Sequence, residues 1–192
     1  LKVCVAKLSN PVLLWIFSFS IAMFTIAHIA FEFFQPYLRL VFIKMELHGD
    51  PFDFGPMAAG LIMGVSHLLS AVMLLYTATI TRKFGVKNTL MGSLLFICFI
   101  IVMMGTAIHP LILILIATRT IPQAIAQPVS LTVVNAQLQS YFRATFLSLQ
   151  NLCGRLVFGL TLLLVSILLG KGTALGEETV LFLLRILGLF SC

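Results

Sequence analysis

The sequence predicts an all-α membrane protein, with six transmembrane helices in a single domain over residues 1–192. Hydrophobic residues make up 60% of the chain and charged residues only 9%, and the mean hydropathy is +1.14. These values lie outside the range of soluble globular proteins. A helix that crosses a bilayer needs about 20 apolar residues, and windows of this kind occur at residues 12–36, 54–80, 89–108, 110–136, 143–169 and 178–190.

The two ends of the chain suggest that it belongs to something larger. The sixth window is too short for a full span, and we expect its helix to be truncated. The chain opens on Leu1 and lacks the basic, apolar and small-residue pattern of a signal peptide. We therefore expect a fragment, or one half, of a larger membrane protein.

Loop charges predict the orientation, because Lys and Arg are enriched in cytoplasmic loops. The side that holds the N-terminus receives basic residues and no acid: Lys2, Lys7, Arg82, Lys83, Lys87 and Arg143. The other side receives both signs: Arg39, Lys44 and Lys171 with Glu46, Asp50, Asp53, Glu177 and Glu178. The N-terminus is therefore expected in the cytoplasm. The net charge of +6 follows from this asymmetry, and no nucleic-acid partner is predicted.

Four of the predicted helices carry polar or small residues along one face, at about 100° per residue. In the first and second helices these are Ser18, Thr25, His28, Glu32 and Gln35, and Gly60, Gly64, His67, Ser70 and Thr77. In the fourth and fifth they are Arg119, Gln123 and Gln127, and Ser148, Asn151, Arg155, Gly159 and Ser166. The third and sixth helices lack such a face. We expect helices one, two, four and five to line a polar cavity, and helices three and six to be peripheral.

Ionisable residues inside a membrane are costly and usually mark a pathway. The candidate substrate or ion pathway consists of His28, Glu32, His67, Arg119, Gln123, Gln127, Asn151 and Arg155. At a rise of ~1.5 Å per residue, Arg155 is about 18 Å from the cytoplasmic end and Arg119 about 14 Å from the outer end. Glu32 is the counter-ion expected for either arginine. Glu32 and His67 are candidates for proton coupling.

Each of these residues also has a structural interpretation. Arg119 or Arg155 could form an ion pair that only holds the bundle together. The Gln123 and Gln127 amides could satisfy carbonyls freed by two nearby prolines, and the histidines could be packing residues. The G-x-x-x-G at residues 60–64 indicates close helix packing.

The cysteines predict no metal site, cofactor or disulfide framework. Cys4, Cys98, Cys153 and Cys192 show no C-x-x-C spacing, and the middle two fall inside predicted spans. We interpret them as small buried hydrophobic residues.

Two stretches carry a family resemblance. "ATITRKFGVKN", between the second and third helices, is similar to the loop motif G-x-x-x-D-R-x-G-R-K of the major facilitator superfamily, with Lys83, Gly85 and Lys87 in register. Ala78 replaces the first Gly and Arg82 replaces the Asp, which removes an acid that helps to close the cytoplasmic gate. "FRATFLSLQNLCGRL", preceded by "RTIPQAIAQPVSLTVVN", resembles the penultimate-helix region of many bacterial members.

The resemblance implies the carboxyl-terminal six-helix half of a twelve-helix transporter in a bacterial plasma membrane. Such a protein moves a small-molecule substrate by alternating access about a site near the midplane. It implies a partner, either a missing N-terminal half or a second copy. It leaves open the substrate, the coupling ion, and whether the protein is a permease for uptake or an efflux protein.

The sequence is also compatible with two other functional classes. A truncated or scaffold membrane protein would not transport at all. An intramembrane serine protease could use Ser66, but the adjacent His67 points about 100° away on a helix, so a base such as His28 would be needed.

Overall fold

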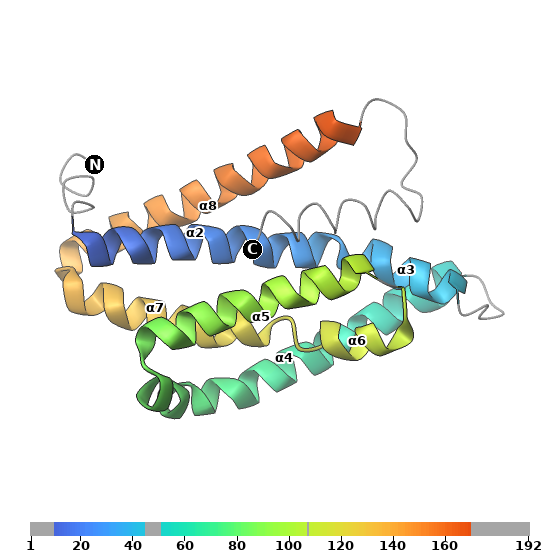
Figure 1. Ribbon diagram of the computed structural model, residues 1–192, viewed down its shortest axis with the longest axis horizontal. Helices are drawn as coiled ribbons and strands as arrows, with labels where there is room; N and C mark the ends of the chain where they lie inside the picture. Colours follow the sequence, from blue (N-terminus) through green and yellow to red (C-terminus); the bar gives the residue numbers. More distant parts are fainter. Residues whose placement is uncertain (1–9, 45–50, 107, 170–192) are drawn as a thin grey trace.

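The computed structural model describes residues 10–44, 51–106 and 108–169 of the chain, and every element in these ranges is helical (Figure 1). Five helical stretches among them are long and apolar enough to cross a membrane. They are Pro11–Lys44, Pro56–Phe84, Val86–Thr106, Pro110–Gln137 and Ser140–Ile167. The all-helical, multi-span membrane class is therefore confirmed. The sixth predicted helix, residues 178–190, lies outside the described residues.

The first span is two helices, α2 (Pro11–Glu32) and α3 (Phe34–Lys44), which meet at Phe33. The break lies three residues before Pro36, because proline has no N–H to donate to the carbonyl of Glu32, four residues back, and its ring crowds that carbonyl. The helical stretch nevertheless continues to Lys44, so the predicted end at residue 36 was wrong by two turns.

The second and third spans, α4 (Pro51–Phe84) and α5 (Val86–Thr106), are separated by Gly85 alone. Its φ of +80° is a backbone conformation that favours glycine. The Gly85 N–H donates to the carbonyl of Thr81 at 2.9 Å, and its own carbonyl accepts the Thr89 N–H at 3.1 Å. The motif that the sequence placed in a loop is therefore almost entirely helical, with one residue making the turn.

The fourth span is also broken, into α6 (Pro110–Ile116) and α7 (Ile121–Gln137). Residues 117–120 form tighter turns, in which Thr118, Arg119 and Ile121 donate to carbonyls three residues back. Pro122 accounts for the break, because it cannot donate to the carbonyl of Thr118, which accepts from Ile121 instead.

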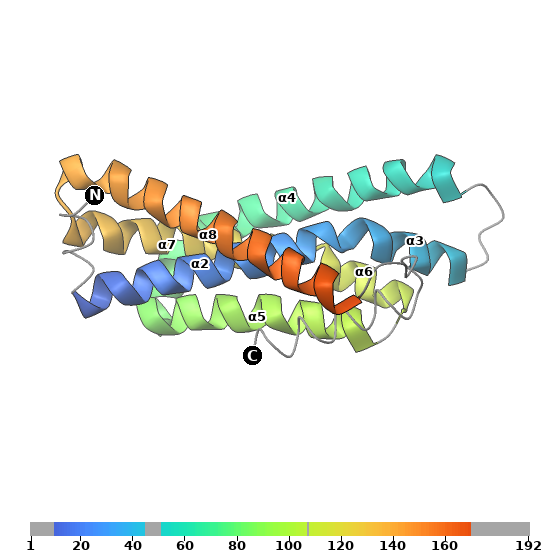
Figure 2. The same cartoon turned by 90° about the horizontal axis from the view of Figure 1, so that it is seen from above.

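The helices run along one axis in alternating directions, and the last, α8 (Ser140–Leu169), lies against α2 (Figures 1 and 2). The helix α4 packs against α7 on the other side. The α4–α5 turn and the α7–α8 turn lie at the same end of the bundle as the start of α2 (Figure 1). Four basic residues of the described ranges lie next to these two turns: Arg82, Lys83, Lys87 and Arg143.

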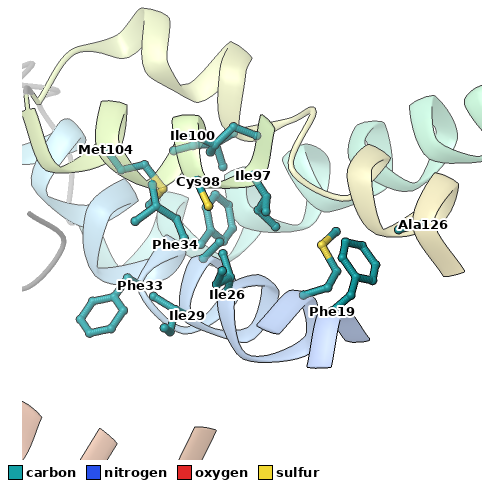
Figure 3. Close-up of a cluster of buried hydrophobic side chains, with 14 of the residues drawn as sticks. Phe19, Ile26, Ile29, Phe33, Phe34, Ile97, Cys98, Ile100, Met104 and Ala126 are labelled. Atoms are coloured by element: carbon teal, nitrogen blue, oxygen red, sulfur yellow. The ribbon is translucent and has the colours of Figure 1, made fainter. Parts of the chain in front are cut away.

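The core lies between α2, α3, α5 and α7 (Figure 3). Phe34, Ile100 and Met104 are fully enclosed there, together with Cys98. Lipid chains are as apolar as these side chains, so packing contacts stabilise the cluster. One face of α5 is buried against α2 and α7. Beyond the exposed Lys87 and Asn88 at its start, the exposed large residues of α5 are apolar: Met91, Leu95, Phe96 and Phe99.

The predictions of close packing at residues 60–64 and of a buried Cys153 were wrong. No helix of the described part of the chain packs on the G-x-x-x-G of α4, because Gly60 and Gly64 are exposed there and have open space around them. The close approach occurs instead at Gly154 of α8, where an added Cβ would lie 3.0 Å from the Phe24 ring of α2. Of the two described cysteines, Cys98 is buried as expected and Cys153 is half-buried.

Candidate functional site

A cavity of about 270 Å³ lies between α2, α7 and α8. Six of its lining residues have hydroxyl or carboxamide side chains: Ser20, Gln123, Gln127, Ser130, Gln150 and Asn151. The other lining residues are apolar, and those of α2 are Phe19, Met23 and Phe24. This cavity combines one apolar wall with polar groups from three helices, which is the usual composition of a small-molecule site.

Helical periodicity places the polar groups in the cavity. On α7, Gln123, Gln127 and Ser130 follow one another at intervals of four and three residues and therefore share one face. On α8, Gln150 and Asn151 are adjacent, and both side chains line the cavity. Gln150 is only 8% exposed, and its Nε2 donates to the carbonyl of Ile16 over a long 3.4 Å.

The structure brings together three of the eight predicted pathway residues: Gln123, Gln127 and Asn151. Sequence reasoning missed Ser20, Ser130 and Gln150. Ser130 continues the stripe of Gln123 and Gln127 by one more turn, so periodicity could have found it. Ser20 and Gln150 lie beside the predicted faces of their helices, and nothing in the sequence distinguished them.

Arg119 lies apart from the two glutamines with which it was predicted to share a face. The turns at residues 117–120 interrupt the helix between Arg119 and Gln123, so the spacing of four no longer aligns them. The Arg119 side chain is 5% exposed, and its guanidinium carbon lies 4.2 Å from the ring centre of Phe34 and 5.5 Å from that of Phe31. Its Nη1 atom is buried without a hydrogen-bond partner among the described residues.

The expected ion pair of Glu32 with an arginine is not formed among the described residues. Glu32 is exposed at the end of α2, and Arg155 is exposed on α8, one turn beyond Asn151. Arg119 meets aromatic rings instead of a carboxylate. The helix break turns Arg119 toward Phe31 and Phe34.

The two histidines of the predicted pathway lie in different surroundings. The His28 ring is stacked on Phe24 at 3.9 Å, lies 5.4 Å from the Phe158 ring, and has its Nδ1 2.8 Å from the carbonyl oxygen of Phe24. It therefore fills the space between α2 and α8. His67 is exposed on α4.

Hydroxyl groups connect α4 to the helix break. The Ser70 and Thr120 hydroxyl oxygens are 2.6 Å apart, and Thr120 donates to the carbonyl of Ser66 at 3.0 Å. The Ser66 hydroxyl is fully buried and has no partner among the described residues. Ser66 and the exposed His67 thus point to different environments.

The basic residues at the turn end have separate surroundings. Arg82, Lys83 and Lys87 are exposed around Gly85. Arg143 is half-buried: its Nε donates to the carbonyl of Leu138 at 2.9 Å, and its Nη2 to that of Asn135 at 2.9 Å. It therefore caps the end of α7, a role that its position near the membrane surface did not indicate.

Comparison of this chain with family models, curated proteins and solved structures finds no match. The chemistry of the cavity is therefore inferred from its own side chains. Carboxamides and hydroxyls can donate and accept hydrogen bonds reversibly. In the described part of the chain, no group of three or more His, Cys, Asp or Glu could hold a metal ion.

Proposed function

We propose that this chain is the carboxyl-terminal half of a secondary transporter of the major facilitator superfamily. A small solute passes through the cavity between α2, α7 and α8 by alternating access. The observation that carries the proposal is the set of six polar side chains that three apolar helices direct into one cavity. Polar residues within spans usually face water or a substrate path.

The two broken spans support a transport role. Discontinuous helices are common at the binding sites of secondary transporters, where the half-helix ends approach the substrate. The break at residues 117–120 lies directly before Gln123, the first cavity residue of α7. The break at Phe33 lies in the first span, which also lines the cavity.

A second half completes the proposed transporter, either a six-helix N-terminal half or a second copy of this chain. The outer helices α4 and α8 leave large apolar residues uncovered, such as Leu75 at 80% and Ile167 at 67% exposed. Lipid covers part of this surface and the second half covers the rest. Glu32 and His67 are both exposed, and we retain them as candidates for proton coupling.

The basic end of the bundle sets the proposed orientation. Arg82, Lys83, Lys87 and Arg143 lie next to the α4–α5 and α7–α8 turns, which are at the same end of the bundle as the start of α2 (Figure 1). By the positive-inside rule this end lies in the cytoplasm of a bacterial cell, with the protein in the plasma membrane.

Reconstitution tests the proposal. The purified chain in liposomes should take up at least one solute from a chemically diverse panel, and uptake should depend on an imposed pH gradient if a proton is coupled. Asn151→Ala should reduce uptake at least tenfold. Ser148→Ala, an exposed change on the same helix outside the cavity, is the matched control. No uptake by a chain that stays monomeric would contradict the proposal for this polypeptide.

A further inference from the structure

Among the described residues, those that line the α2–α7–α8 cavity include no ionisable side chain. The buried Arg119 is turned toward Phe31 and Phe34 and does not line the cavity. Arg155 and Glu32 are exposed and lie outside the lining as well. The cavity therefore presents neutral dipoles to any ligand.

We propose that this cavity binds a small, uncharged solute that carries several hydrogen-bonding groups and one apolar face. The proposal names the substrate class and rests on the proposed function for the passage of that solute, although binding alone does not require transport. Polyols and cyclic amides share this chemistry.

The available hydrogen bonds favour such a solute. Each of the four carboxamides offers two N–H donors and one carbonyl acceptor, and each hydroxyl offers both roles. The only hydrogen bond found for these side chains among the described residues is the 3.4 Å contact of Gln150 with Ile16. Donors and acceptors thus stand side by side, which suits hydroxyl or amide groups that also both donate and accept.

The same lining disfavours ions. A carboxylate or ammonium that gives up its hydration shell to bind loses several kcal/mol unless an opposite charge or a metal compensates. Neutral hydrogen bonds return only about 0.5–1.5 kcal/mol each. No charged side chain from the described ranges lines this cavity.

The apolar wall and the size limit the ligand further. Phe19, Met23 and Phe24 form the wall contributed by α2, against which the carbon-bound hydrogens of a ring can pack. A volume of about 270 Å³ lies just under the roughly 300 Å³ at which drug-sized pockets begin. A single ring with its substituents is the size that fits.

Direct binding to the full chain in detergent, measured by isothermal titration, tests the class. The probes are glucose and uracil as neutral ligands, with glucuronate, glucosamine and orotate as charged relatives of similar size. We expect at least one neutral probe to bind, and its charged relatives to bind at least tenfold more weakly. Failure of both neutral probes at millimolar concentration, or equal binding of a charged relative, would overturn the proposal.

Charge-introducing variants give the second readout. Gln127→Glu is nearly isosteric and should weaken the binding of glucose while it strengthens the binding of glucosamine. Gln139→Glu, outside the cavity, should change the affinity for neither probe. Unchanged preference in folded Gln127→Glu protein, as judged by circular dichroism and gel filtration, counts against the cavity as the binding site. Binding of a neutral probe without transport would reject the proposed function and leave this inference standing. Transport of an ion that is lost in Asn151→Ala would support the proposed function and reject the inference that the solute is uncharged.

Discussion

The guanidinium carbon of Arg119 lies 4.2 Å from the centre of the Phe34 ring, and Nη1 of the same arginine has no hydrogen-bond partner among the described residues. An aromatic face can stabilise a desolvated cation by about 2 kcal/mol. Removal of a buried charge in favour of an apolar residue is often neutral or stabilising. Replacement of this buried arginine is therefore expected to leave the stability of the protein unchanged or to raise it.

We expect Arg119→Met to leave the thermal stability of the protein in detergent unchanged or to raise it. Phe34→Leu should lower stability in the parent protein and cost less in the Arg119→Met background, with a coupling of about 1–2 kcal/mol in a double-mutant cycle. Thermal unfolding followed by circular dichroism measures both. A large loss of stability in Arg119→Met would mean that an acid pairs with this arginine.

Gly154 should not tolerate a methyl group. Its added Cβ would lie 3.0 Å from Cδ1 and 3.1 Å from Cγ of Phe24, and the ring cannot retreat freely because His28 is stacked on it. Overpacking of this kind typically costs about 1–3 kcal/mol. Gly159→Ala on the same helix is the control, since it meets nothing within 4 Å and alanine favours a helix by about 1 kcal/mol. Equal melting temperatures for the two variants would contradict the close crossing.

Gly85 should be required for the turn between α4 and α5. With φ at +80°, an alanine there costs roughly 1–2 kcal/mol because its Cβ crowds the backbone. Asparagine should cost less than alanine, since it tolerates this conformation better. Gly92→Ala, inside α5 with open space around it, should be neutral or stabilising. Melting temperatures that fall in the order Gly92→Ala, Gly85→Asn, Gly85→Ala would agree with a left-handed backbone conformation at Gly85.

Arg143 should contribute more to stability than the other basic residues at its end. Loss of its two hydrogen bonds to the carbonyls of Asn135 and Leu138, at the end of α7, should cost about 1–3 kcal/mol, because hydrogen bonds from a charged group to a helix end are stronger than neutral ones. Arg143→Lys should recover only part, since lysine lacks the fork that reaches both carbonyls. Arg82→Ala, an exposed change at the same end, should cost less than half as much by chemical or thermal unfolding.

The sequence was sufficient to predict the helices because their signal is strong and local. Long apolar windows and loop charges predicted five of the described spans and their alternating directions. One-face periodicity predicted that Gln123, Gln127 and Asn151 would share a cavity. Periodicity failed at Arg119, because it assumes an uninterrupted helix and Pro122 interrupts this one. It also failed for Gln150, whose position depends on how α8 crosses α2. The G-x-x-x-G of α4 did not predict helix packing correctly, because small residues permit a close contact between helices without requiring it.

The crossing of α2 and α8 at Gly154 gives α8 the geometry of a lever. Before that point its side chains Leu147, Gln150 and Asn151 line the cavity, and beyond it the helix separates from α2 toward its end at Leu169 (Figure 1). With ~1.5 Å per residue the outer arm is about 22 Å long, so a tilt of about 10° at this fulcrum would displace its tip by about 4 Å. The same tilt would shift the cavity residues, which lie within two turns of the fulcrum, by far less. A solute could thus stay held while the outer end of the helix swings.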